Sequence, residues 1–317
     1  MVVAFSKDSL KGIIPATVTP MKADSSVDID AYDSYLKWIV DQGVTGLAVN
    51  VDTGEGPALT SDEKTILLGI ARQRLGASKT LVAGLSAGSL RAAVQEARRA
   101  RETGADLILV FPNAAFRGEP QDSEALGRYY SEIAVSAGVD LMIFQLQDAL
   151  GGIEFGEEVL STLASIEQVV AIKEATFNFS KYKRTMELFK RLEEKSGRHI
   201  AFLTGNDNFL FESFLWGCDG GLIGAAAQDT VNIVDCYNAC TRRDWSRAVG
   251  LAQKLQPLVD TVFAPPVRSY RARTKACLYL QGVIPSRSVR SPLVETPELE
   301  LPGLRDALRN AGLKVMA

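Results

Sequence analysis

Short apolar segments alternate with longer amphipathic segments along most of the chain. Runs of buried-strand character lie at 13–20, 46–51, 80–85, 107–111, 141–145, 169–175, 200–204 and 221–225. The segments between them have apolar residues at helical spacing, and several begin with a capping residue, such as Asp28 or Asp30 and the capping box of Thr60 and Glu63. Eight strand–helix units in succession predict an α/β protein with a (β/α)8 TIM barrel over residues 1–243. A doubly wound sheet is the weaker alternative.

The residues after the eighth unit follow a helical pattern only. Candidate helices cover 245–259, 267–280 and 301–311, and turns that contain proline separate them. No low-complexity linker divides this part from the rest. We therefore predict a C-terminal helical segment, residues 244–317, that packs on the barrel.

The composition indicates which kinds of molecule the protein is expected to bind. The 317 residues are 46% hydrophobic and carry a net charge of −3, so the sequence predicts a large core and no basic surface for a nucleic acid or a membrane. Four cysteines form no metal-binding or disulfide spacing and are expected to be buried free thiols. The first residues, Met1–Lys7, do not resemble a targeting segment, so we expect a soluble, cytoplasmic protein that binds a small molecule.

A lysine interrupts the apolar run at 169–175. Strand alternation places Lys173 on the same side as Val169 and Ala171, and a run this apolar suits a parallel sheet that is covered on both faces. Burial lowers the pKa of a lysine, which then has a neutral amine that can attack a ketone and form a Schiff base. The alternative is a lysine whose stem is buried and whose amine reaches solvent at a strand end.

Active sites of TIM barrels lie at the carboxyl ends of the strands. Polar residues at these positions are Thr19, Asp52, Thr53, Glu55, Ser86, Asn113, Gln145, Gln147, Asp148, Lys173, Thr204 and Asn206. His199 precedes the seventh strand, at the opposite end. No cluster of His, Cys and acidic residues has metal-ligand spacing, so neither a metal nor another cofactor is expected.

Together these motifs resemble the dihydrodipicolinate synthase and N-acetylneuraminate lyase superfamily of class I, Schiff-base aldolases. The matching segments, which span nearly the whole chain, are 18–20, 53–55 with 59–63, 104–106, 171–175, 204–207, 275–276 and 290–292. The resemblance implies that Lys173 forms a Schiff base with a 2-oxo acid such as pyruvate. It also implies a homodimer or homotetramer.

The chain departs from the family pattern at several functional positions. Asp52 replaces the first of two loop threonines, and Phe144 replaces the tyrosine that ends strand five and delivers protons in relatives. Asn113-Ala114 stands where relatives have two tyrosines, one of which crosses the subunit interface. An arginine found after strand five in synthases is also missing. These losses predict that the chain is not a true dihydrodipicolinate synthase.

The remaining residues allow a coherent hypothesis. Lys173 is the Schiff-base residue, Asp52 supplies acid–base catalysis in place of the tyrosine relay, and Thr53 with nearby amides binds the substrate carboxylate. Glu55 is expected to be structural. The further candidates for contact with the substrate are Gly54, Asn113, Gln145, Gln147 and Ile223.

Three functional classes follow. The preferred one is a lyase of the aldolase or dehydratase type that acts on a 2-oxo acid. A second is a catalytically impaired relative that binds a keto acid or sugar acid as a regulator. A third is an unrelated barrel enzyme that uses Asp52 or Glu55 with a divalent ion.

Overall fold

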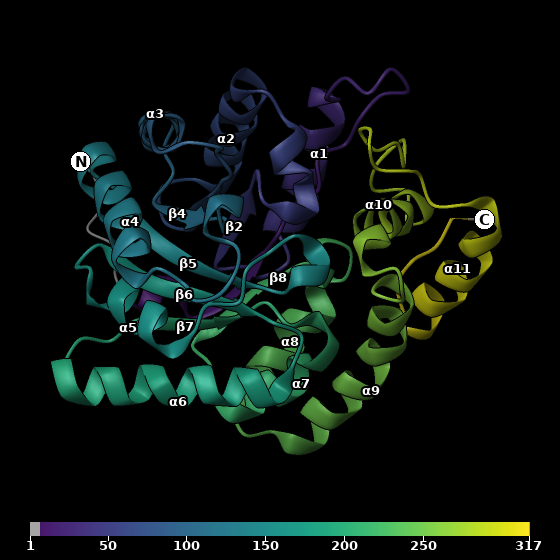
Figure 1. The fold of residues 1–317 in the computed structure, drawn as a ribbon. Helices are drawn as coiled ribbons and strands as arrows, with labels where there is room; N and C mark the ends of the chain where they lie inside the picture. Colours follow the sequence, from purple (N-terminus) through teal and green to yellow (C-terminus); the bar gives the residue numbers. More distant parts are fainter. Residues whose placement is uncertain (1–6, 317) are drawn as a thin grey trace.

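The computed structural model describes residues 7–316 and shows a parallel eight-stranded barrel surrounded by helices (Figure 1). The strands follow the order β1-β8-β7-β6-β5-β4-β3-β2, and a bridge between Ala16 and Ala48 joins β1 to β2 and so closes the barrel. Their bounds are β1 Gly12–Pro15, β2 Gly46–Val49, β3 Thr80–Leu85, β4 Leu107–Val110, β5 Asp140–Leu146, β6 Val169–Ala175, β7 Ala201–Thr204 and β8 Gly220–Ile223. The predicted (β/α)8 fold is confirmed.

A helix follows each strand and lies on the outside of the barrel. The helices are α1 Ile29–Val40, α2 Ser61–Leu75, α3 Leu90–Glu102, α4 Ser123–Ala137, α5 Glu157–Ser165, α6 Phe179–Ser196, α7 Leu210–Trp216 and α8 Thr230–Thr241. Asp28 caps α1, and the predicted capping box of Thr60 and Glu63 is present at α2. Local hydrogen-bonding preferences therefore set these helix starts as expected.

The core has two layers. Inward-facing side chains such as Ile14, Leu109, Phe144 and Leu203 fill the barrel, while outward-facing ones pack against α1 to α8. This arrangement explains why the strands are apolar on both faces. The barrel is therefore a packed interior, and only its rim offers space for chemistry.

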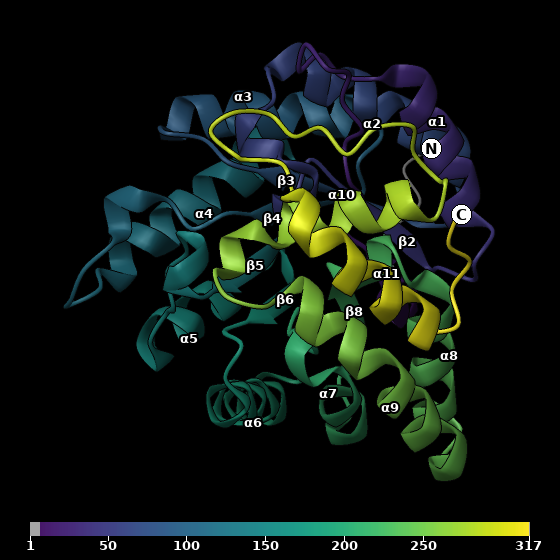
Figure 2. The same cartoon turned by 90° about the vertical axis from the view of Figure 1, so that its right-hand side faces the viewer.

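Three helices complete the chain: α9 Trp245–Val262, α10 Tyr270–Leu280 and α11 Leu301–Asn310. They form an apolar cluster of their own, which includes Leu258, Cys277 and Leu308. Figure 2 shows α9, α10 and α11 in front of the strands, so they cover one end of the barrel. Because α10 contacts the loop after β2, this is the carboxyl end of the strands.

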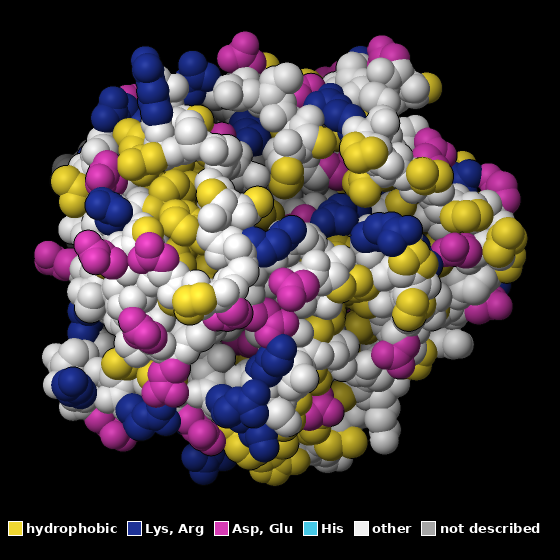
Figure 3. All heavy atoms as spheres, in the orientation of Figure 1, with side chains coloured by type: hydrophobic (Ala, Val, Ile, Leu, Met, Phe, Trp, Pro, Cys, Tyr) yellow, Lys and Arg dark blue, Asp and Glu magenta, His cyan; other side chains and the backbone are white. Residues whose placement is uncertain are grey.

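The surface carries acidic and basic side chains of both signs, intermingled across the face seen in Figure 3. In residues 7–316 no helix is both long and apolar enough to cross a membrane. All four cysteines are free and buried, as expected. The expectation about the N-terminus rests mostly on residues 1–6, which lie outside the described part of the chain.

Candidate active site

A cavity opens at the carboxyl ends of the strands, and it encloses about 300 Å³ including the solvent at its mouth. This size is at the lower end of the range for small-molecule sites. Its walls come from β5, β6, the loops after β2, β7 and β8, and the C-terminal helices. The lining residues are Asp52, Thr53, Phe144, Leu146, Leu150, Lys173, Ala175, Phe177, Gly205, Asp207, Gly224, Phe263 and Tyr270.

Lys173 enters this cavity from β6. Its neighbours Ala171 and Ala175 belong to the cluster inside the barrel, so the lysine faces inward as predicted. Val169 does not share that side. A register shift between β5 and β6 pairs Leu141 with Val169 but Met142 with Ala171, and this bulge turns Val169 toward the outer helices.

The environment of Lys173 is apolar on one side and acidic on the other. Its Nζ lies 4.5 Å from the centre of the Phe144 ring, and the side chain is only 7% exposed. Burial lowers the pKa of Lys173 to about 8, although the carboxylates of Asp207 and Asp52 oppose this shift. The alternative of an amine that reaches solvent is therefore wrong for this lysine.

Two residues of the loop after β7 adjoin the lysine. A Cβ on Gly205 would lie 2.5 Å from Cε of Lys173, so glycine leaves the space that the lysine stem occupies. Asp207 is held by the amide of Ala225, which donates to its Oδ1 at 2.6 Å. Burial raises the pKa of Asp207 to about 6, and the nearby Lys173 works against that rise.

Asp52 and Thr53 lie in a short 3-10 helix, η2 (Asp52–Gly54), directly after β2. Oδ1 of Asp52 pairs with Nη2 of Arg271 at 2.5 Å, and Oδ2 accepts a hydrogen bond from the Tyr270 hydroxyl at 2.6 Å. The Thr53 hydroxyl lies 3.3 Å from the same tyrosine oxygen. The C-terminal segment thus supplies the partners of both predicted catalytic loop residues.

Tyr270 is the main component of the site that the sequence did not indicate. The positions expected for an active site in a TIM barrel are the loops that follow strands, whereas Tyr270 begins α10, in the helical extension. Its ring stacks on Phe263 with centroids 4.9 Å apart. No local pattern in the sequence marks this tyrosine, because its position depends on the packing of α10 across the barrel mouth.

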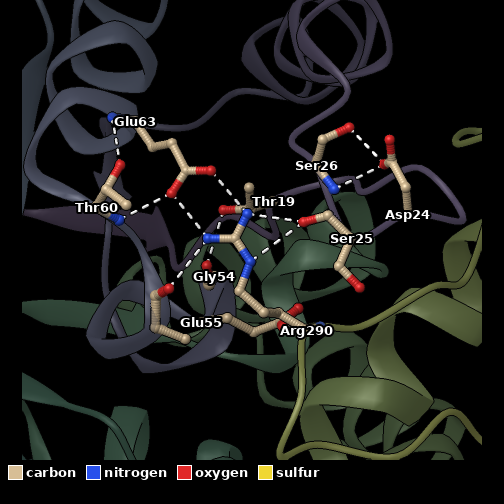
Figure 4. Close-up of polar contacts among 10 residues, drawn as sticks. Thr19, Asp24, Ser25, Ser26, Gly54, Glu55, Thr60, Glu63 and Arg290 are labelled. Carbon is tan, nitrogen blue, oxygen red and sulfur yellow. Dashed lines mark hydrogen bonds and ion pairs between the residues drawn. The ribbon is translucent and has the colours of Figure 1, made fainter.

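The loop after β2 is fastened to the C-terminal segment by charged residues. Glu55 forms an ion pair with Lys275 in which both side chains are fully buried, and it accepts the backbone amide of Arg290 at 2.7 Å. Figure 4 shows the Arg290 guanidinium between Glu63 and the carbonyl of Ser25. These contacts give Glu55 a structural role, and they hold it in a left-handed conformation with φ of 59°.

The remaining substrate-binding candidates do not line the cavity. The amide of Gln145 exchanges two hydrogen bonds with the backbone of Phe155, because Gln145 faces the helices. Asn113 bonds the backbone of Ala87 and Ala115, and Ile223 is buried in the outer core.

Gly54 and Gln147 complete this set. The amide of Gly54 donates to Val51, and its carbonyl accepts from Thr19. Gln147 is half-buried and does not line the cavity, although its neighbour in the sequence, Leu146, does. Of the site residues expected from the sequence, Lys173, Asp52 and Thr53 line the cavity, and Tyr270 and Asp207 line it with them.

Comparisons with known proteins agree with this geometry. A family model described as the dihydrodipicolinate synthetase family matches residues 9–311. A 4-hydroxy-tetrahydrodipicolinate synthase of Bifidobacterium longum (strain DJO10A) is 30% identical over 302 residues, which are 95% of this chain and 94% of the relative. The synthase of Kosmotoga olearia is 27% identical over 303 residues, which are 96% of this chain and 99% of the relative.

Solved structures show the same similarity. The chloride-inhibited dihydrodipicolinate synthase of Acinetobacter baumannii, complexed with pyruvate, has a TM-score of 0.82 at 26% identity and covers 96% of this chain and 99% of its own. The synthase of Thermotoga maritima has a TM-score of 0.85 at 24% identity, and the match covers 96% of this chain and 99% of the T. maritima chain. The chain therefore belongs to the dihydrodipicolinate synthetase family, and it is an enzyme of that family's Schiff-base lyase class.

Proposed function

We propose that this enzyme cleaves, forms or dehydrates a 2-oxo acid that is held as a Schiff base on Lys173. The observation that carries the proposal is the Lys173 amine, which lies in the cavity at the strand ends with its pKa lowered to about 8. A lowered pKa gives a useful fraction of neutral amine near pH 7, and only the neutral amine attacks a ketone. The pyruvate complex of the A. baumannii relative supports a small 2-oxo acid as the substrate.

Thr53 is proposed to hold the substrate carboxylate. Thr53 lies at the cavity wall and its hydroxyl bonds Tyr270, so the proposed donors to the carboxylate are the backbone amide of Thr53 and the amides near it. Asp52 serves in acid–base catalysis, as it is the carboxylate on the wall formed by the loop after β2. Phe144 supplies only an apolar surface beneath the amine.

We further propose that the reaction is not the synthesis of 4-hydroxy-tetrahydrodipicolinate. That product is a dicarboxylate, so its synthase must accommodate a second carboxylate besides that of the 2-oxo acid. Among the described residues that line the cavity, Lys173 is the one cation, and the nearby Arg271 is already paired with Asp52. Leu146, Leu150, Phe177 and Phe263 make the rest of the wall apolar, which favours a partner aldehyde without charge.

The Schiff base is tested by reduction with borohydride in the presence of pyruvate and longer 2-oxo acids, followed by intact-mass spectrometry. We expect a covalent adduct with the native enzyme and none with Lys173→Ala. The initial rate of imine formation should rise with pH up to about 8 and level off above it, because the amine is neutral above its pKa. Absence of an adduct with every acid at every pH would refute the proposal.

The preference for an uncharged aldehyde is tested with pyruvate and a matched pair of aldehydes, succinic semialdehyde and hexanal. We expect kcat/KM for hexanal to be higher by about tenfold or more, because Asp207 repels a second carboxylate and Lys173, the one cation among the described lining residues, is already bonded to the 2-oxo acid. The variant Leu150→Arg places a cation on the wall and should shift the preference toward succinic semialdehyde. Equal use of both aldehydes by the native enzyme, or formation of 4-hydroxy-tetrahydrodipicolinate, would contradict this part of the proposal.

A further inference from the structure

Tyr270 lies in the wall of the cavity that a molecule bound to Lys173 would occupy. Tyr270 and Lys173 line the same cavity, and the tyrosine is only 4% exposed. Its ring stacks on Phe263, and the guanidinium carbon of Arg271 lies 5.2 Å from the centre of the Tyr270 ring. The hydroxyl therefore has one defined location at the cavity wall.

Hydrogen bonding fixes the direction of the hydroxyl. The single hydroxyl proton of Tyr270 is donated to Oδ2 of Asp52 at 2.6 Å. The contact of 3.3 Å between Tyr270 and Thr53 must then be donated by Thr53. The result is a directed chain from Thr53 through Tyr270 to Asp52, in which the tyrosine oxygen keeps a lone pair that can accept a further hydrogen bond.

Schiff-base chemistry needs such a chain, and strand five does not provide it. The ring beneath the Lys173 amine is that of Phe144, which has no proton to transfer. We propose that Tyr270, contributed by the C-terminal helix α10, is the proton-transfer residue of this site and that Asp52 holds the transferred proton. This inference rests on the proposed Schiff base at Lys173 and adds the group that makes it form and react quickly.

The proton balance closes without an additional reactant. The Lys173 ammonium passes one proton to the Tyr270 oxygen while Tyr270 passes its own to Asp52, and the free amine adds to the ketone carbon. The same proton returns through Tyr270 to the carbinolamine hydroxyl, which leaves as water. The sum is ammonium plus ketone giving iminium plus water. In the next step a C3 proton of the iminium follows the same route to Asp52, and the C–H electron pair forms the enamine.

Arg271 holds the Asp52 carboxylate, the proposed proton acceptor, next to Tyr270. Its guanidinium holds Oδ1 of Asp52, and its Nε donates to the Asp52 carbonyl at 3.2 Å, so the carboxylate cannot turn away from the tyrosine. Burial raises the pKa of Tyr270, and the adjacent Asp52 charge raises it further, so the tyrosine is protonated at rest. Arg271 is thus a positioning residue for Asp52.

The test compares Tyr270→Phe with the native enzyme in two measurements. Exchange of the C3 protons of pyruvate in deuterated buffer, followed by NMR, should slow by about 10²-fold or more, which is the usual contribution of a general acid–base group. The amount of imine trapped after equilibration should stay unchanged, because a proton-transfer group changes rates and not equilibria. Tyr182→Phe, which removes a buried hydroxyl that bonds Ser213 away from the cavity, is the matched control with native exchange.

A second variant keeps the test decisive if Tyr270→Phe does not fold. Asp52→Asn retains an acceptor for Tyr270 but cannot take up a proton, and it should slow exchange in the same way. In the Tyr270→Phe background, Phe144→Tyr should restore part of the exchange, which a purely structural role would not allow.

The outcomes separate this inference from the proposed function. Lack of any imine in the native enzyme refutes the Schiff base itself. Native-like exchange in Tyr270→Phe refutes the role of Tyr270 and leaves Asp207, the other carboxyl group of the cavity, to move the protons. A folded Tyr270→Phe variant that loses the equilibrium imine also refutes it, because the tyrosine would then shape the site.

Discussion

Replacement of Lys173 by alanine is expected to lower kcat by at least about 10⁴-fold, a loss of the size seen when the nucleophile of a covalent mechanism is removed. Among the described residues that line the cavity, Lys173 is the one cation. In the proposed mechanism its amine nitrogen bonds to the substrate carbon. Neither Thr53 nor Tyr270 can replace it, because a hydroxyl forms no imine. Steady-state assays with the best 2-oxo acid from the trapping experiment measure the effect.

A matched control distinguishes this loss from general damage. Lys190, on the exposed face of α6, should be replaceable by alanine without a change in kcat. If Lys173→Ala bound its ligand with native affinity and the native protein showed no turnover, the chain would be a binding protein that retains the enzyme fold. Residual turnover above about 1% of native in Lys173→Ala would place the chemistry on another group.

The largest effect on stability is expected from Glu55→Gln. Glu55 and Lys275 form an ion pair with no exposed side-chain surface, and removal of one partner leaves a buried charge that water cannot solvate. The cost in the free energy of unfolding should be about 3–5 kcal/mol. Urea denaturation followed by circular dichroism measures it as a shift of the midpoint at constant slope.

The partner substitution provides the control for this prediction. In Glu55→Gln combined with Lys275→Met the buried charge is gone, so a large part of the lost free energy should return. A change of less than about 1 kcal/mol in the single variant would contradict the prediction, and it would mean that the carbonyl of Ser288, at 2.8 Å from Nζ, suffices for Lys275.

The sequence predicted the fold well because the signals for it are local. The strands β3 and β6 have the predicted bounds, and Thr60 and Glu63 form the predicted capping box. Periodicity and capping depend on residues a few positions apart, so they can be read from one chain. The same holds for Lys173, since an isolated charge in an apolar strand is a visible anomaly.

The site was predicted only in part because its remaining features are not local. Tyr270 reaches Asp52 across 218 positions, and no pattern within α10 indicates that contact. Gln145 was misplaced for a different reason: it follows Phe144 in the strand and therefore points to the opposite face, where it bonds Phe155. The bulge in β6 likewise moved Val169, because strict alternation does not foresee an extra residue.

Residues of α10 and of the segment after it complete the mouth of the barrel and bond to the loop after β2. The loop after β2 leaves the ribosome well before Tyr270, Lys275 and Arg290, because Asp52 and Tyr270 are 218 positions apart in the chain. Contacts this distant in sequence are closed late in folding, since loop entropy opposes them until the intervening chain is compact. A nascent chain that already has all eight strands therefore still lacks a finished catalytic centre, and the enzyme becomes active only after α10 has been made and packed across the barrel.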